Sequence, residues 1–134
     1  MNHSLRIAAA AGAFALALSA AASAATVRLV PLGAHTTAVS RTGCPAESAP
    51  ASVVAPPIAL PEIAAQMKTT GVAAIRVDLD PRGTLASAAV LRSSGNRWID
   101  LAALRAARLS TYSAEVRGCE RIGGRYALIV DFTE

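Results

Sequence analysis

Residues 71–109 read GVAAIRVDLDPRGTLASAAVLRSSGNRWIDLAALRAARL, and the succession of patterns in this stretch decides the fold. Apolar and polar residues alternate from Gly71 to Asp80, which predicts a β-strand with one buried face. The apolar positions are Ala73, Ile75, Val77 and Leu79. We therefore expect this strand to lie on the hydrophobic core.

A tight turn follows the strand. Asp80 stands at its first position, Pro81 fixes φ at the second and Gly83 stands at the fourth, a combination typical of a β-turn. It predicts an antiparallel hairpin with a second strand over residues 84–92. The apolar residues of that second strand do not keep one parity, which indicates either a β-bulge or an apolar residue on the outer face.

The main helix is predicted after the second strand. Asn96 is an N-cap residue for a helix from Arg97 to about Leu109. At 100° per residue, one face of this helix carries apolar side chains, most of them alanine. They belong to Ile99, Ala102, Ala103 and Ala106. Such a face allows the helix to approach a sheet closely.

Shorter elements lie on either side of this stretch. Pro61 can begin a short helix from Glu62 to Lys68. Gly123-Gly124 predicts a turn, and the alternation from Tyr126 to Phe132 predicts a terminal strand. The expected fold is α+β: a small antiparallel β-sheet of about three strands, with the main helix packed on one face and the short helix preceding the sheet.

The N-terminus has the pattern of an export signal. Arg6 supplies a positive charge, Ile7 to Leu18 is apolar, and Ala22-Ser23-Ala24 fits a cleavage site. We expect residues 1–24 to be a signal peptide and the mature chain to be periplasmic. The alternative is an uncleaved anchor over residues 7–25, which would place the protein on the inner membrane, facing the periplasm.

Composition excludes several classes of protein. The chain has 134 residues, of which 53% are hydrophobic but only 4% aromatic, so one small Ala-rich domain is expected. Its net charge is +4, and removal of Arg6 with the signal leaves 12 basic against 9 acidic residues, a mild +3. Basic and aromatic residues are not interleaved, which argues against a nucleic-acid partner.

Residues 25–55 form an extended lead-in rich in Pro and Ala, and they contain Cys44. The second cysteine is Cys119, and two cysteines in an exported chain suggest one disulfide, Cys44–Cys119. A catalytic thiol is the alternative, although His35 has no acidic residue nearby to orient it. A metal site lacks ligands, because His3 and His35 are the only histidines.

The pattern of an enzyme is missing from the sequence. We find no Ser/His/Asp set, no paired carboxylates, no phosphate-binding glycine loop and no metal-ligand spacing. The chain is therefore expected to be a non-enzymatic protein that needs no cofactor.

The ordered motifs of residues 56–134 resemble the C-terminal domain of the TonB family. The resemblance rests on Leu60-Pro61, Gly71, Gly83, Ser93-Ser94-Gly95, the helix from Ile99-Asp100 to Ala107, and a terminal strand ending at Phe132. Within this set, Ser94, Gly95 and Asp100 are interpreted as loop and helix-start residues without a ligand.

The resemblance implies a partner and a mode of binding. Domains of this family bind outer-membrane receptors, and a short extended receptor segment joins the edge of the sheet. By resemblance, partner binding falls on the terminal strand, namely Tyr126, Ala127, Leu128, Ile129, Val130, Asp131 and Phe132, together with Leu60 and Pro61. The family usually has Tyr before that proline, where this chain has Leu60.

Three functions are compatible with these features. The first is a periplasmic binding module associated with TonB-dependent outer-membrane transport, pairing an edge strand with a partner segment. The second is a membrane-anchored energy transducer, although residues 7–25 contain no histidine and residues 45–61 would span only about 50 Å as polyproline II. The third is a structural envelope domain that self-associates, for example as a homodimer.

Overall fold

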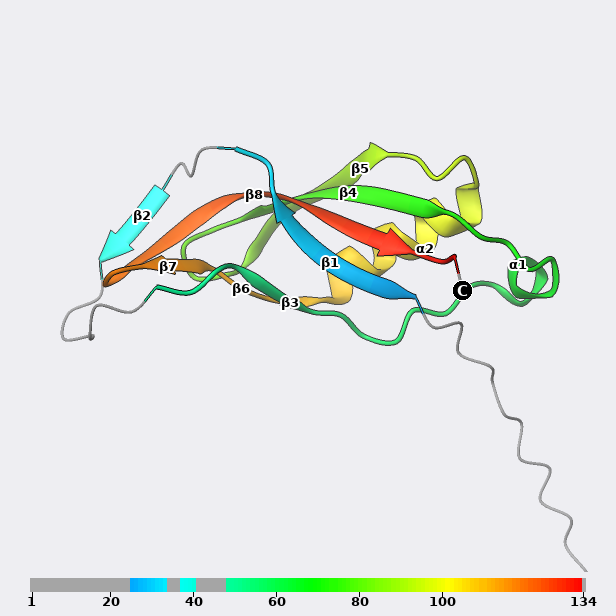
Figure 1. Cartoon of the computed structure of the whole chain (residues 1–134), viewed down its shortest axis with the longest axis horizontal. Coiled ribbons are helices and arrows are strands. Elements are labelled where there is room, and N and C mark those ends of the chain that lie inside the picture. The colour runs from blue at the N-terminus through cyan, green and yellow to red at the C-terminus, as the bar shows by residue number, and fades with distance from the viewer. Residues whose placement is uncertain (1–24, 34–36, 41–47, 134) are drawn as a thin grey trace, which may run out of the picture.

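The computed structural model describes residues 25–33, 37–40 and 48–133, and every structural statement below concerns these residues. Ten elements follow one another along this part of the chain (Figure 1). They are β1 (Thr26–Pro31), β2 (Thr37–Ser40), β3 (Ser52–Val54), α1 (Glu62–Gln66), β4 (Val72–Leu79), β5 (Leu85–Arg92), α2 (Arg97–Leu109), β6 (Thr111–Ser113), β7 (Glu115–Arg117) and β8 (Glu120–Asp131).

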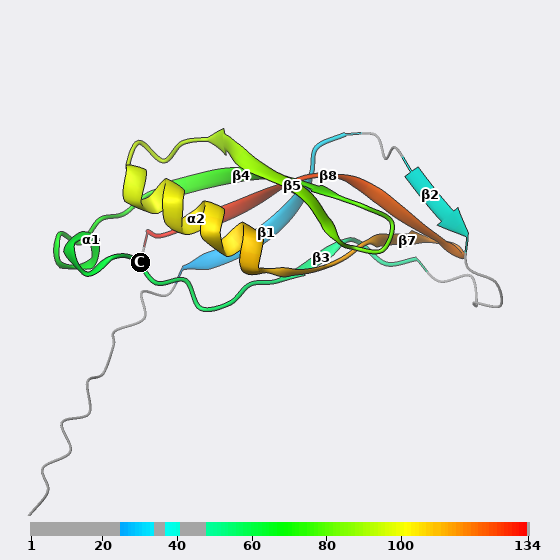
Figure 2. The ribbon, with the colours of Figure 1, turned by 180° about the vertical axis from the view of Figure 1, so that it is seen from behind.

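An antiparallel sheet forms the body of the molecule. Its strands lie in the order β1-β8-β4-β5, and β2 and β7 pair with the first part of β8. A second, two-stranded sheet joins β3 to β6. Helix α2 lies across one face of the main sheet (Figure 2). The predicted α+β architecture with one main helix is therefore found, but the expectation of about three strands was too low.

The first hairpin forms as its sequence predicts. The Asp80 carboxylate accepts hydrogen bonds from the backbone N–H groups of Arg82 and Thr84, both at 2.8 Å, and the Asp80 carbonyl accepts one from Gly83 N–H at 2.9 Å. Strand β5 pairs with β4 through two register shifts, near Ala74/Ile75 and Asp78/Leu79. The irregular parity of residues 84–92 is thus explained by bulges.

Helix α2 begins and packs as expected. The Asn96 side chain accepts a hydrogen bond from Trp98 N–H at 2.9 Å, which satisfies one donor of the first turn. The predicted apolar face is buried in one core cluster with side chains of β4 and β8. The largest fully buried side chains are Ile75, Val77, Ile99, Leu128 and Val130.

The terminal strand is longer than predicted, because Gly123-Gly124 does not form a turn. Both glycines lie inside β8, which starts at Glu120 and turns from β7 through Gly118 and Cys119. A Cβ on Gly123 would lie 2.7 Å from the Leu79 carbonyl oxygen. Glycine at this position therefore permits close approach of the β4–β5 turn rather than a change of chain direction.

The N-terminal lead-in contributes strands to both sheets. Within residues 25–55, β1 and β2 pair with β8, and β3 pairs with β6. The alternation of Thr26 to Val30 was too short to predict a strand from sequence, and its partner lies near the other end of the chain, with Thr26 opposite Asp131 and Pro31 opposite Tyr126. Pairing between residues so far apart in the sequence leaves no local sequence pattern that would predict it.

Candidate partner-binding edge of strand β8

Strand β8 lies inside the sheet, whereas the family resemblance implied an edge strand at Tyr126–Phe132. On one side, its residues Gly124 to Asp131 pair with β4. On the other side, Tyr126 to Asp131 pair with β1 in an unbroken antiparallel register (Figure 1). The expected edge is therefore covered by residues 26–31 of the same chain, which is a correction to the sequence-based prediction.

The direction of the backbone groups of β8 follows from two hydrogen bonds. Leu32 N–H donates to the Arg125 carbonyl at 2.9 Å, and Phe132 N–H donates to the Gly71 carbonyl at 2.9 Å. The backbone N–H and C=O groups of successive residues in an antiparallel strand point towards opposite neighbouring strands. The odd-numbered residues of β8 therefore direct these groups towards β1, and the even-numbered residues direct theirs towards β4. The backbone groups on the β1 side belong to Arg125, Ala127, Ile129 and Asp131.

The side chains of the predicted terminal strand fall on two faces. Tyr126, Leu128, Val130 and Phe132 are buried in the core cluster under α2. On the opposite face Ala127 is buried, whereas Ile129 and Asp131 are partly exposed. Most side chains of this strand are therefore part of the core.

Leu60 and Pro61 lie at the end of the sheet where β8 finishes. Leu60 is half-buried against the core cluster. Pro61 is exposed, and its carbonyl accepts the N–H groups of Ala64 and Ala65 at 2.9 and 3.0 Å, which begins α1. Both views place α1 beside the C-terminal end of β8 (Figures 1 and 2). The structure therefore brings the two predicted segments to the same end of the molecule.

At the two ends of the path β1-β8-β4-β5, the outer sides of β5 and β1 also lack a ladder partner among the described residues, and neither offers an uninterrupted row of backbone groups for pairing. Strand β5 pairs with β4 through two register shifts, and such shifts twist an edge away from straight pairing. The outer side of β1 includes Pro31, whose register with Tyr126 directs its nitrogen away from β8. Proline has no N–H to donate there.

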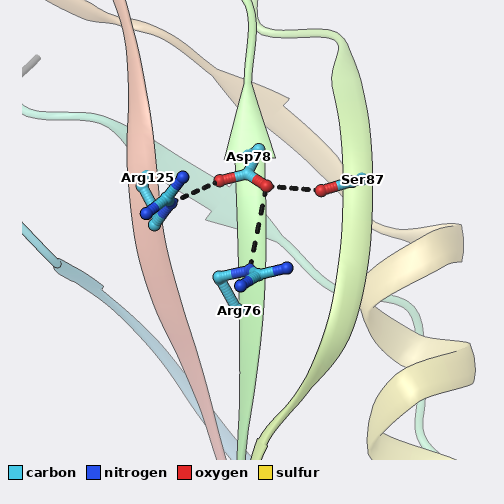
Figure 3. Close-up of polar contacts among 4 residues, drawn as sticks. All are labelled: Arg76, Asp78, Ser87 and Arg125. Atoms are coloured by element: carbon cyan, nitrogen blue, oxygen red, sulfur yellow. Dashed lines mark hydrogen bonds and ion pairs between the residues drawn. The ribbon is translucent and has the colours of Figure 1, made fainter. Parts of the chain in front are cut away.

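A polar cluster centred on Asp78 ties β8, β4 and β5 together on the sheet face opposite α2 (Figure 3). The Asp78 carboxylate accepts hydrogen bonds from the Ser87 hydroxyl and from Arg125 Nε at 3.0 Å, and Arg76 Nε lies 3.8 Å from it. The Ser87 hydrogen bond, followed by Arg125, holds the pKa of Asp78 below its usual value despite partial burial. The cluster is a cross-strand clamp.

The Ser-Ser-Gly motif and Asp100 form a second structural cluster. Asp100 accepts hydrogen bonds from the Ser93 hydroxyl, and from the Ser94 N–H and hydroxyl at 2.8 Å each. Burial raises the pKa of Asp100, but these hydrogen bonds outweigh it and leave the pKa below its usual value. Their geometry fixes the β5–α2 loop to the first turn of the helix, in agreement with the structural role assigned to these residues.

Several predictions concern residues that the structure does not describe. The signal peptide, or anchor, of residues 1–24 and Cys44 lie outside the described ranges. Cys119 lies in the β7–β8 turn, so the Cys44–Cys119 disulfide stays a prediction. In the described part of the chain, no helix is long and apolar enough to cross a membrane, and no cluster of His, Cys, Asp and Glu could hold a metal ion.

Comparison with known protein families identifies the domain. The family model described as "Gram-negative bacterial TonB protein C-terminal" matches residues 56–133, more than half of the chain. The chain belongs to this family. Searches among curated proteins and among solved structures found no match. The match confirms the resemblance inferred from the motifs, and TonB C-terminal domains are periplasmic binding domains that interact with outer-membrane receptors.

The boundaries of the TonB domain show which strands of the sheet belong to it. Strands β4, β5 and β8 and helix α2 lie within residues 56–133, whereas β1, β2 and β3 precede them. The strand that covers β8 therefore comes from outside the family domain. Sequence reasoning missed this strand, and the only signal was the short alternation Thr26-Val27-Arg28-Leu29-Val30.

Proposed function

We propose that this protein is an exported, periplasmic binding module associated with TonB-dependent outer-membrane transport. It binds an extended segment of an outer-membrane receptor by strand addition to β8 and requires no cofactor. One observation carries the proposal: within the family domain itself, β8 is the last strand on its side of the sheet, because β1 comes from outside residues 56–133.

The chemistry of that side suits an extended peptide. Its backbone donors and acceptors belong to Arg125, Ala127, Ile129 and Asp131, and they are spaced for one continuous ladder. Backbone hydrogen bonds supply affinity that depends little on the partner's sequence, and contacts to alternate side chains supply specificity. Leu60, at the same end of the sheet, adds an apolar contact surface.

Binding is tested by titrating the ¹⁵N-labelled protein with synthetic peptides that copy periplasm-facing extended segments of TonB-dependent receptors. Two matched versions of each peptide are N-methylated at alternate residues, so that each version loses the backbone donors of one side only. We expect amide shifts along β8, and a loss of affinity of more than about tenfold for one version alone. Equal affinities for both versions would exclude strand pairing, and the absence of binding by every peptide would exclude the function.

A further inference from the structure

Strand β1 occupies the side of β8 at which the proposed partner would pair. We infer that β1 is a built-in competitor, and that the partner is an extended segment with apolar residues two positions apart which replaces β1 on β8. This inference rests on the proposed function and specifies its partner and its binding step.

The burial of β1 shows which of its groups a partner must imitate. Val27 and Leu29 are half-buried against the core cluster, whereas Thr26, Arg28 and Val30 are exposed on the strand. A segment that replaces β1 therefore needs apolar side chains at the two positions that face the core. It tolerates polar or charged residues between them, as the exposed Arg28 demonstrates.

The same burial makes β1 easier to release from the main sheet than β4 or β8. It has six residues, pairs with a single neighbour, β8, and buries no side chain completely. By contrast, β4 and β8 each pair on two sides and contain fully buried side chains. Local opening follows the amount of buried apolar surface and the number of protected hydrogen bonds, so β1 leaves β8 before β8 and β4 separate.

Strand exchange also fits the geometry better than addition to either end of the path β1-β8-β4-β5. A partner on β5 would meet the two register shifts, and a partner on β1 would lack one donor at Pro31. Replacement of β1 instead gives the partner the regular register that β1 itself holds from Thr26 to Pro31.

The first test is amide hydrogen exchange of the unsubstituted full chain by NMR. Release of β1 exposes the amides of Ala127 and Ile129 and leaves those of Leu128 and Val130 bonded to β4. We expect the first pair to exchange at least about tenfold faster than the second, an alternating pattern within one strand. One common rate for all four amides would overturn the inference, because β1 would then open only with the whole domain.

The second test uses a peptide with the sequence of residues 25–33, ATVRLVPLG, as the probe. Leu29→Asp weakens the docking of β1, and Leu101→Asp places the same charge at a leucine on α2 that is 51% exposed. We expect the Leu29→Asp chain to bind the probe about tenfold more tightly than the unsubstituted and Leu101→Asp chains. If the Leu29→Asp chain bound the probe equally or more weakly, the replacement of β1 would be wrong. Weaker binding is the result expected if the probe instead adds to the outer side of β1.

Receptor peptides separate this inference from the proposed function. If they bind all three chains with equal affinity, the function stands and the inference fails. If the probe binds the Leu29→Asp chain and no receptor peptide binds any chain, the function fails and β8 is still an exchangeable site. A dimer that exchanges β1 between two copies, detected as a doubled mass by light scattering, would overturn the inference because the site would serve a second copy.

Discussion

Asp78 connects three strands with one carboxylate, and its charge state therefore affects stability. The pKa of Asp78 in the folded chain is lowered by Ser87 and Arg125, so the ionised group stabilises the fold above the usual carboxyl pKa. That contribution is lost as the pH falls from about 4 through the lowered pKa. The side chain of Asp78 is 29% exposed, which limits the effect through solvent screening.

Asp78→Asn is expected to lower the free energy of unfolding by about 1 kcal/mol at pH 7. The difference should shrink as the pH falls below about 4, because Asp78 is then protonated in the unfolded chain before it is protonated in the folded one, and protonation favours unfolding. Urea unfolding at two pH values, about 7 and about 3, measures it, with Glu62→Gln as a control that removes the same charge from α1. A difference between Asp78→Asn and the native chain that does not change with pH would contradict this account.

Gly83 illustrates a residue whose role extends beyond its own turn. Its φ is +85°, and a Cβ would lie 2.8 Å from the Tyr112 carbonyl oxygen on β6. Gly83→Ala should therefore lower the free energy of unfolding by about 2–3 kcal/mol through backbone strain and steric clash. Gly95 has φ +86°, and no atom lies within 4 Å of the position that its Cβ would take, so Gly95→Ala measures strain alone. Equal losses in chemical denaturation would show that the contact with Tyr112 is unimportant.

At the scale of elements, the proposed strand pairing predicts that the backbone of β8 matters more for binding than its exposed side chains. Ile129 directs its N–H towards β1, on the side assigned to the partner. Ile129→Pro removes that donor, and we expect affinity for receptor peptides to fall by more than about tenfold. Ile129→Ala keeps the donor and should bind nearly as well as the native chain. Circular dichroism establishes folding, and normal binding by a folded Ile129→Pro chain would disprove edge pairing.

The elements differ in how far their sequence determines them. The hairpin and α2 were predicted closely, because Asp80, Gly83 and Asn96 act through hydrogen bonds within a few residues. The position of β8 in the sheet was not predicted, because it depends on pairing with residues 26–31 near the other end of the chain. Gly123 misled the prediction for the same reason: the contact that requires glycine is with Leu79 of another strand.

At the scale of the whole molecule, the folded lead-in limits the reach of the domain. A transducer requires an extended spacer between its anchor and its receptor-binding domain, and residues 25–61 are the candidates for it in this sequence. The structure pairs β1 and β3, within that segment, with β8 and β6. These residues shorten the span available, which favours a free module over an anchored transducer.

The processing of the N-terminus decides how freely β1 can move. Cleavage after Ala24 would leave one residue, Ala25, before β1 begins at Thr26, so the strand would be a chain terminus able to leave β8 at one end. An uncleaved anchor over residues 7–25 would instead hold β1 directly at the membrane surface. We expect the protein isolated from its native envelope to begin at Ala25 and to occur in the soluble periplasmic fraction, as determined by intact mass and N-terminal sequencing. A chain that retains residues 1–24 in the inner-membrane fraction would contradict the exported module and would favour the membrane-anchored transducer instead.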